Sequence, residues 1–499
     1  MSETNNRYET LDKKLWKAND KLRKNIDAAE YKHVVLGLVF LKYISEVFNE
    51  YHHNLIQEGV NAEDKERYKE AGIFYVPPEA RWAYLQTKTK DQDIGQAINK
   101  AMDLIEQENP RLAGVLPKIY ANNNLDPVSL AGLIDLFSDI TLKDAQIGDV
   151  LGHVFEYFLG QFAALEAKRG GQYYTPRSIV ELLVEMVEPR QGKVYDPCCG
   201  SGGMFVYSEQ FIERHKANPG DIVLYGQESN QATWRLCKMN LEMRGIDSSN
   251  IIWNSEGSFL NDAHPDLKAD YILANPPFND SDWHGELLRE DKRWVYGTPP
   301  VNNANYAWIQ HFLYHLADNG TAGFVMTNGS LSAGKQEGEI RKRIIEDHRV
   351  DCIVSLPDKL FLNTQIPACI WILRTNKQKR RDEVLFIDAS NMGHLINRAT
   401  RELSSEDIEQ IANTYHNWRN GTEQYHDIPG FCKSATLEEI RNNEYVLIPA
   451  RYIDANIEEE TITKEQLDQL IAEFEKEIEE EQELNKTIIN NLKRLKINE

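Results

Sequence analysis

Residues 193–203 of this 499-residue chain read KVYDPCCGSGG, and the helix-like segment MFVYSEQFIERHK follows at residues 204–216. The first part is strand-like and ends at Asp196, and three glycines among residues 200–203 let the backbone turn sharply and approach a ligand. A plain strand-to-helix turn also favours glycine, but an acidic strand end before three glycines favours a cofactor site, in which Asp196 accepts a hydrogen bond from a cationic amine. No Gly-Lys-Ser/Thr follows, so the turn is not a phosphate loop.

Helix-like segments alternate with short β-rich runs from about residue 145 onward. The runs read KVYDP, DIVLYGQES, IIWNS, DYILANPP, TAGFVMTN, DCIVSLP, ACIWILRT and EVLFID. This alternation predicts an α/β fold with a mainly parallel sheet, whose ligands bind at the carboxyl ends of the strands. The run DIVLYGQES carries Glu228 at its end, where nucleoside-binding α/β folds offer a carboxylate to ribose hydroxyls. That placement supports a ligand with an adenosine group, and a plain surface carboxylate is the alternative.

Two helical regions flank the alternating part of the chain. Residues 8–140 carry apolar residues at three- and four-residue spacing, as in EYKHVVLGLVFLKYISEVFNEYHH, with few strand-like runs. We therefore expect a helical N-terminal domain over residues 1–144, an α/β domain over residues 145–450 and a helical tail over residues 451–499. The tail should pack against its own domain or against a partner helix. Its heptad seam consists of Leu467, Ile471, Phe474, Ile478, Ile488, Leu492 and Leu495.

The composition is that of an ordinary globular protein. With 41% hydrophobic and 10% aromatic residues the chain should fold, and no run of 18 or more apolar residues predicts a membrane span. The start, MSETNNRYETLDKK, lacks the apolar core of a signal peptide, so we expect a cytoplasmic protein. The six cysteines form no CxxC pair and have no paired histidine spacing, so we expect reduced thiols, with neither a zinc site nor a disulfide framework.

The charge balance argues against tight DNA binding by the chain alone. Its 56 basic and 78 acidic residues give a formal charge of −22, whereas affinity for nucleic acid depends on cationic contacts to phosphates. The basic run Lys377–Arg381 lies between the strand-like segments ACIWILRT and EVLFIDAS, and we expect it to be a solvated hairpin turn. Another subunit should therefore supply the DNA contacts.

Another strand end reads LANPPFND at residues 273–280. Neither proline donates a backbone hydrogen bond and both fix φ, so the chain after Asn275 is stiff and its carbonyls have few local partners. Upstream, GGQYYTPRSIVELLVEMV places Thr175 as the N-cap of a helix and Pro176 at its first position. Capping explains Thr175 and Pro176, but it leaves the preceding Gly-Gly and Tyr-Tyr pairs unexplained.

In chain order, YYTPR, DPCCGSGG, GQES and NPPF resemble the gamma-arranged amino-methyltransferases that use S-adenosylmethionine and modify DNA adenines. Four further stretches are similar to the modification (M) subunit of type I restriction–modification systems: WVYGTPPVNNANYAWIQHFL, FVMTNGSL, IRKRIIE and IVSLPDKLFLNTQIPACIWIL. The resemblance covers nearly the full chain, including the helical front domain and tail. It implies a Rossmann-like, S-adenosylmethionine-dependent methyltransferase domain that methylates adenine N6 in double-stranded DNA.

The resemblance also implies which residues hold the cofactor. The motif at Gln172–Arg177 would line the methionine end, the glycine turn would cradle the cofactor and Glu228 would hold the ribose. The implied cofactor-binding residues are Gln172, Tyr173, Tyr174, Thr175, Pro176, Arg177, Asp196, Gly200, Ser201, Gly202, Gly203 and Glu228. Residues 254–259 match the family's adenine-binding segment only loosely and are left unassigned. No metal is implied.

The catalytic residues implied by the resemblance are Asn275, Pro276, Pro277 and Phe278. An exocyclic amine is a poor nucleophile because its lone pair is delocalised into the purine. The Asn275 side-chain oxygen and the Pro276 carbonyl would accept both amino hydrogens, which favours a pyramidal nitrogen, and the two prolines would hold these acceptors rigid. Phe278 would stack on the extruded base, a contact worth about 1–3 kcal/mol that offsets an extrusion cost of roughly a few kcal/mol.

Three alternatives to this interpretation stay open. Similar motifs occur in enzymes that methylate glutamine amides in proteins or guanines in RNA, but those usually have Tyr in place of Phe278 and lack YYTPR together with NNANYAWIQH. A non-catalytic assembly subunit is disfavoured because the Asn-Pro-Pro-Phe motif and the glycine turn are intact. A stand-alone adenine methyltransferase would need a recognition domain, for which residues 390–450 leave too little room.

The resemblance implies partners as well as chemistry. Two copies of this chain would assemble with one specificity (S) subunit, to which a restriction (R) subunit can add. The complex would act on double-stranded DNA and have no membrane partner. The recognition sequence would reside in the S subunit, so this chain does not encode it.

Overall fold

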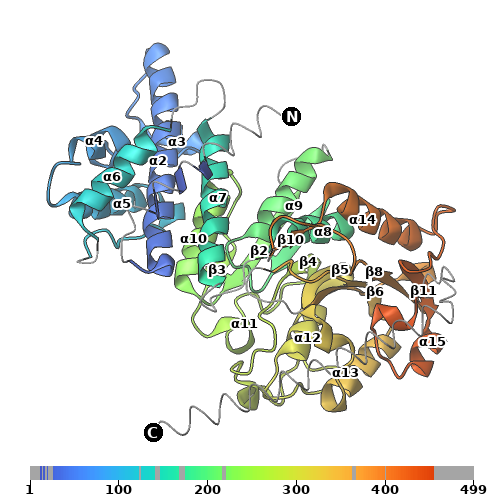
Figure 1. Ribbon diagram of the computed structural model, residues 1–499. Helices are drawn as coiled ribbons and strands as arrows, with labels where there is room; N and C mark the ends of the chain where they lie inside the picture. The colour runs from blue at the N-terminus through green and yellow to red at the C-terminus, as the bar shows by residue number, and fades with distance from the viewer. Residues whose placement is uncertain are drawn as a thin grey trace, which may run out of the picture. The chain divides into compact units, whose positions relative to one another are not determined.

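The computed structural model describes residues 12–13, 15–16, 19–20, 26–122, 125–140, 147–167, 175–215, 221–361, 367–398 and 400–453. In Figure 1 the helical region runs from blue to cyan, and the strands of the sheet follow in green to red. The predicted tail seam from Leu467 to Leu495 lies outside the described residues, and the two boundaries between the three predicted domains stay predictions. None of the helices in the described part of the chain is both long enough and apolar enough to cross a membrane.

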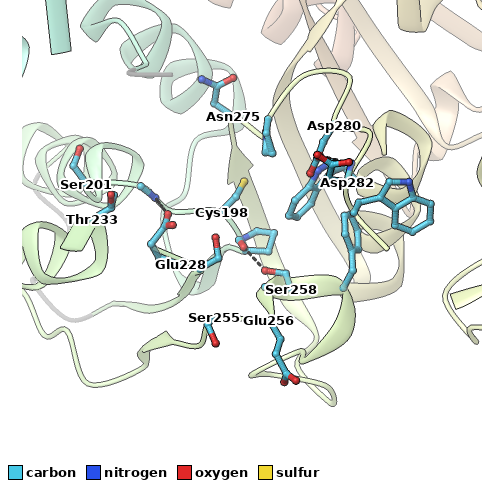
Figure 2. Close-up of a pocket in the computed structure, with 18 of the residues that line it drawn as sticks. Cys198, Ser201, Glu228, Thr233, Ser255, Glu256, Ser258, Asn275, Asp280 and Asp282 are labelled. Carbon is cyan, nitrogen blue, oxygen red and sulfur yellow. Dashed lines mark hydrogen bonds between the residues drawn. The ribbon is translucent and has the colours of Figure 1, made fainter. Parts of the chain in front are cut away.

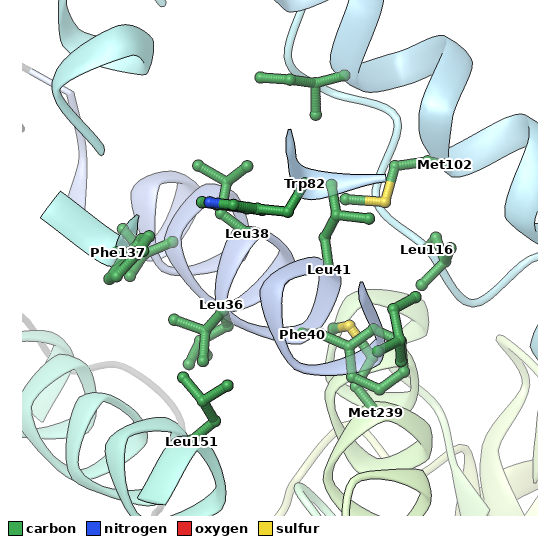
Figure 3. Close-up of a cluster of buried hydrophobic side chains, with 14 of the residues drawn as sticks. Leu36, Leu38, Phe40, Leu41, Trp82, Met102, Leu116, Phe137, Leu151 and Met239 are labelled. Carbon is green, nitrogen blue, oxygen red and sulfur yellow. The ribbon is translucent and has the colours of Figure 1, made fainter. Parts of the chain in front are cut away.

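The predicted helical region is present in the described residues before the sheet. Its helices are α2 (Ala28–Gln57), α3 (Lys65–Glu70), α4 (Trp82–Thr87), α5 (Ile94–Glu108), α6 (Pro127–Ser138) and α7 (Ile147–Ala167), with short 3-10 helices at Pro78–Ala80 and Pro110–Leu112. The start of α6 is specified locally, because Asp126 accepts a hydrogen bond from the backbone N–H of Ser129 and Pro127 occupies the first helical position. The apolar faces of α2, α4, α5, α6 and α7 share one core (Figure 3).

In the described part of the chain, nine strands form one mixed sheet in the order β11-β8-β6-β7-β5-β4-β1-β2-β3. Their bounds are β1 (Gly192–Asp196), β2 (Ile222–Glu228), β3 (Ile251–Trp253), β4 (Ala269–Ala274), β5 (Leu316–Thr327), β6 (Val350–Ser355), β7 (Ala368–Arg374), β8 (Glu383–Asp388) and β11 (Cys432–Thr436). Strand β7 runs antiparallel to β5 and β6, and β11 antiparallel to β8, whereas the other five pairs are parallel. Each predicted strand run forms a strand, so the predicted α/β class is confirmed.

The prediction of a hairpin turn at Lys377–Arg381 is wrong. Strand β6 lies between β7 and β8, so the segment crosses over β6 and does not join neighbouring strands. Lys377 is buried, and its Nζ donates to the carbonyl oxygen of Val350 at the start of β6 over 2.6 Å. The local sequence could not reveal this order, because the strand inserted between the two segments comes earlier in the chain.

Helices cover both faces of the sheet. They are α8 (Arg177–Val187), α9 (Gly203–Arg214), α10 (Gln231–Glu242), α11 (Gly257–Leu260), α12 (Asn305–His315), α13 (Lys335–Glu346), α14 (Ser405–Asn420) and α15 (Leu437–Asn442), with further 3-10 helices at Gly285–Leu288, Asn328–Leu331, Gln378–Arg380 and Pro449–Arg451. The buried side chains of α8, α9 and α14 belong to one apolar core, and those of α12 and α13 to another. The parallel strands therefore present their carboxyl ends, and not their faces, to ligands.

Helix α10 joins the sheet to the helical region. Cys237 and Leu241 pack in the core of the sheet, while Met239 packs in the helical core, where Figure 3 shows it near Phe40. The buried carboxylate of Glu242 accepts a hydrogen bond from Arg111 over 2.8 Å. Side chains of the helical region are thereby held beside the carboxyl edge of the sheet.

Candidate functional site

Strand β1 delivers Asp196 to the carboxyl edge of the sheet. The carboxylate is buried, and its Oδ1 accepts a hydrogen bond from the backbone N–H of Cys198 over 3.0 Å. Burial, together with the negative charge of Glu228, raises the pKa of this carboxyl to about 7. An ionised Asp196 would stabilise a cation bound here, because opposite charges attract strongly where water is excluded.

The glycine turn follows Asp196. Gly202 has φ +81°, and a Cβ atom there would lie 2.8 Å from Sγ of Cys237, so the position excludes larger residues. The backbone N–H of Gly200 donates to Oε2 of Glu228 over 3.0 Å, which ties the turn to the end of β2. Burial raises the pKa of Glu228 as well. The glycine turn, Asp196 and Glu228 therefore lie together at the carboxyl ends of β1 and β2.

Two adjoining hollows open along this edge. The larger has a volume of about 600 Å³ and includes Glu228, Asn275 and Pro277 in its lining (Figure 2). The smaller, of about 90 Å³, is lined by residues that include Thr175 and Asp196. Both hollows are lined by Leu159, Cys198, Gly200, Ser201 and Asn275. Asn275 therefore lies where the two hollows meet.

The structure brings most of the described candidate residues together at these hollows. Lining residues among them are Thr175, Arg177, Asp196, Gly200, Ser201, Gly203, Glu228, Asn275 and Pro277. Pro176, Gly202, Pro276 and Phe278 do not line either hollow, and they lie next in the chain to residues that do. Gln172, Tyr173 and Tyr174 lie outside the described residues, so their placement stays a prediction.

The nitrogen and the oxygen of the Asn275 side-chain amide differ in their hydrogen bonding. Its Nδ2 donates to Oγ1 of Thr175 over 2.9 Å, while its buried Oδ1 has no hydrogen-bond partner among the described residues. The expected N-cap role of Thr175 is therefore wrong: α8 begins at Arg177 with Pro176 as its N-cap, and no side chain caps it. The Thr175 hydroxyl orients Asn275 and leaves the amide oxygen as an acceptor in need of a donor.

Phe278 is half-buried at the start of the turn after β4. Its ring lies against that of Phe361 in an edge-on arrangement, with the two centroids 5.9 Å apart. Phe361 is buried in the core that carries α8 and α14. The contact fixes one side of the Phe278 ring, and base stacking on this ring stays a prediction.

A clamp of asparagines holds the turn that follows Phe278. Asn279 has φ +54°, a left-handed conformation that asparagine tolerates better than most residues. The buried Asn305 accepts from the Asn279 backbone N–H over 3.0 Å and donates to its side-chain oxygen over 2.8 Å. Ala304 adds a backbone hydrogen bond to the carbonyl of Asp280 over 3.0 Å. From the sequence, this stretch, NNAN, entered only as part of the family resemblance and Asn305 was given no structural role, although three asparagines in four residues before a helix were the available signal.

The segment left unassigned in the sequence, residues 254–259, also reaches the site. Residues 255–259 line the larger hollow, and Oγ of Ser258 donates to the carbonyl of Pro197 over 2.5 Å. Helices of the N-terminal region contribute Lys32 from α2 and Ala163 from α7 to the same lining. The walls therefore come from more of the chain than the motifs indicated.

One cluster in the described part of the chain has the donors for a metal ion. The cluster consists of Asp262, His311 and His315. Each offers one ligand atom, and the three atoms lie within 4.8 Å of one another. Asp262 and His315 contact one another over 2.9 Å, and the guanidinium of Arg293 lies 3.2 Å from Nδ1 of His311. The positive charge of Arg293 beside this nitrogen would repel a bound metal ion. The geometry therefore favours a buried hydrogen-bond network over a metal site.

Comparison with known proteins places this geometry in a family. Residues 146–461 match the family model described as N-6 DNA Methylase, and residues 11–137 match the HsdM N-terminal domain. The chain is 48% identical over 402 residues to the type I restriction enzyme HindI methylase subunit of Haemophilus influenzae, covering 76% of this chain and 89% of that one. It is 39% identical over 506 residues to the type I restriction enzyme MjaIX methylase subunit of Methanocaldococcus jannaschii, covering 96% of this chain and 90% of that one.

A solved structure gives the same result for the fold. The chain is similar to a type I restriction–modification system methyltransferase subunit from Streptococcus thermophilus, with a TM-score of 0.77 and 26% sequence identity. The match covers 90% of this chain and 100% of the other chain. The likeness therefore includes both the helical region and the sheet.

Proposed function

The chain belongs to the N-6 DNA methylase family and is an adenine-specific DNA methyltransferase of the type I restriction–modification kind, and from that premise we propose how its residues act. S-adenosylmethionine is the proposed methyl donor, and N6 of an adenine extruded from double-stranded DNA is the proposed acceptor. When bound, this cofactor supplies a methyl group on a cationic sulfonium. The observation that carries the proposal is the unpartnered Oδ1 of Asn275 where the two hollows meet.

The two hollows suit the two ends of the proposed cofactor. Asp196 lines the smaller hollow, where its carboxylate, when ionised, can hold a cationic amine. Glu228 in the larger hollow can accept hydrogen bonds from ribose hydroxyls through its oxygens. The left-handed glycine turn lets the backbone approach a ligand between them.

Asn275 and Pro276 are the proposed acceptors for the target amine. Thr175 holds the amide nitrogen of Asn275, which directs Oδ1 away from that contact and leaves it for an amino hydrogen. The Pro276 carbonyl would take the second hydrogen. With both hydrogens engaged, the amine nitrogen is favoured in a pyramidal form whose lone pair can attack, and the rigid prolines keep reorganisation small.

Asn275→Ala tests this assignment. We expect roughly 10²–10³-fold slower methyl transfer, the usual loss on removing a preorganised polar group, with unchanged cofactor affinity in calorimetry. The exposed Asn413 on α14 provides a matched control, since Asn413→Ala removes the same amide far from the hollows. Near-normal turnover in Asn275→Ala would refute the role of its oxygen.

We further propose that the chain acts in a complex of two copies with one DNA-reading specificity subunit, to which a restriction subunit can add. Its formal charge of −22 opposes DNA binding by the chain alone. The purified chain should bind DNA weakly and without sequence preference, and should methylate only after the second subunit is added. Site-specific methylation by the single chain would contradict this dependence.

A further inference from the structure

A short hairpin with an apolar tip follows β8. Its strands, β9 (His394–Leu395) and β10 (Arg401–Glu402), are antiparallel, and the Ile396 backbone N–H donates to the Thr400 carbonyl over 3.0 Å. The side chains of Leu395 and Ile396 are 52% and 53% exposed. Two adjacent aliphatic side chains in water at a hairpin tip indicate a surface that is covered when the protein acts.

The hairpin has a fixed base. Gly393 has φ +79°, and a Cβ atom there would lie 2.7 Å from the carbonyl oxygen of Glu402, so the position requires glycine. Arg401 donates through NH1 to the carbonyls of Met392 and Gly393 over 3.0 and 3.1 Å. These contacts hold the tip in one orientation relative to the sheet.

The hairpin lies at the catalytic edge. Strand β8 is parallel to β6, and β6 runs in the direction of β4 because β7 is antiparallel to both β6 and β5. The end of β8 therefore faces the same way as the end of β4, where Asn275 lies. The Arg401 backbone N–H donates to the Lys359 carbonyl over 2.9 Å, and two residues further along that loop Phe361 contacts Phe278. The hairpin is thus continuous with the catalytic segment.

The charge of the tip suits a polyanion. The sequence from His394 to Thr400, HLINRAT, contains no acidic residue, in a chain with a formal charge of −22. Arg398 is exposed beside the two aliphatic side chains. An apolar pair next to an exposed guanidinium fits the base stack and the backbone phosphate of duplex DNA.

We propose that Leu395 and Ile396 enter the duplex as an apolar wedge where the target adenine leaves it, and that Arg398 contacts a neighbouring phosphate. This inference rests on the proposed methylation of an extruded adenine. Extrusion opens a gap in the base stack, and aliphatic side chains inserted between bases cover the exposed faces. The wedge stabilises the extruded state and does not touch the reacting atoms.

The test uses the complex with its specificity subunit and DNA that carries 2-aminopurine at the target position, whose fluorescence rises when it leaves the stack. With Leu395→Ala/Ile396→Ala we expect most of this rise to be lost, and methylation of paired adenine DNA to fall about tenfold. A mismatch opposite the target should restore methylation to within about twofold, because such a base is already easier to extrude. Val128→Ala, at a residue 76% exposed on α6, is the control and should change neither reading.

Arg398→Gln tests the phosphate contact separately. Its affinity for DNA should fall, and the slope of log affinity against log salt concentration should decrease by about 1. An unchanged slope would overturn the role of Arg398.

Three results would overturn the wedge. The first is equal loss by the double variant on paired and mismatched DNA, and the second is no loss on either. The third is dissociation of the specificity subunit from the double variant in gel filtration, which would identify the hairpin as a subunit contact. The fluorescence reading requires no methyl transfer, so a wild-type complex that extrudes 2-aminopurine but leaves the matching adenine DNA unmethylated would refute the proposed function and leave the wedge standing.

Discussion

The glycine turn after β1 and the Asn-Pro-Pro-Phe segment after β4 lie at the same edge of the sheet but are held in different ways. The turn is held through its backbone groups: the N–H of Cys198 donates to Asp196, and the N–H of Gly200 donates to Glu228 at the end of β2. The catalytic segment is held from a distance: Asn275 by Thr175, 100 positions away, and Asn279 by Asn305, 26 positions away. Cofactor binding should therefore depend on the backbone geometry of the turn, and catalysis on hydrogen bonds between side chains.

The largest expected effect is at Gly202. Gly202→Leu places a side chain at φ +81° with its Cβ 2.8 Å from Sγ of Cys237, so the turn must deform and cofactor binding should be lost. Calorimetry measures the affinity, and circular dichroism checks that the sheet still forms. Gly114→Ala is the control: it has φ +72° in open space, so its strain should leave the cofactor affinity unchanged. Wild-type affinity in Gly202→Leu would remove the turn from the proposed pocket.

The next effect tests the side-chain hydrogen bonds that hold the catalytic segment. Asn305→Ala removes both hydrogen bonds to Asn279, and a misplacement of the catalytic segment by about 1 Å can cost on the order of 10²-fold in rate. We expect kcat to fall by this order while KM for the cofactor is unchanged. Asn303→Ala should be milder, because its Nδ2 is 3.4 Å from the Asn279 side-chain oxygen. Equal losses of cofactor affinity and kcat in Asn305→Ala would mean that the two regions are not independent.

The pH dependence of cofactor affinity tests the role of Asp196. Burial raises the pKa of this carboxyl to about 7, so below pH 7 the free protein holds it neutral and a cationic amine must displace the proton. Affinity for S-adenosylmethionine should therefore fall as pH falls below 7, by up to about tenfold per pH unit, and level off above 7. Asp196→Asn should bind more weakly and lose this dependence. An unchanged pH profile in Asp196→Asn would exclude the proposed contact with the amine.

The smallest effect is expected at Phe278. Removing a ring that stacks on a base costs about 1–3 kcal/mol in comparable sites, so Phe278→Ala should weaken DNA binding and leave cofactor affinity unchanged. Its loss of turnover should be milder than that of Asn275→Ala, because the acceptor for the amine remains. Phe361→Leu is the companion variant, since it removes the edge-on contact and keeps the Phe278 ring. A larger defect in Phe278→Ala than in Asn275→Ala would reverse the proposed roles.

The comparison also explains what the sequence could predict. The strand ends at Asp196, Glu228 and Asn275 were readable because apolar runs, glycines and prolines act within a few residues of one another. The clamp by Asn305 was not readable, because it joins a helix start to a turn 26 positions earlier. The hairpin expected at Lys377–Arg381 failed for a related reason, since β6 separates two strands that are consecutive in the chain. The Thr175 hydroxyl was assigned to a helix cap because its long-range partner, Asn275, has no local signature.

The most direct test of the proposed function is to map methyl groups on DNA treated with the complex of this chain and its specificity subunit. The geometry at Asn275 predicts N6-methyladenine at one recognition sequence, present with the wild-type chain and absent with Asn275→Ala. Methyl groups on another base or another atom, or methylated protein or RNA beside unmodified DNA, would contradict the proposed reaction.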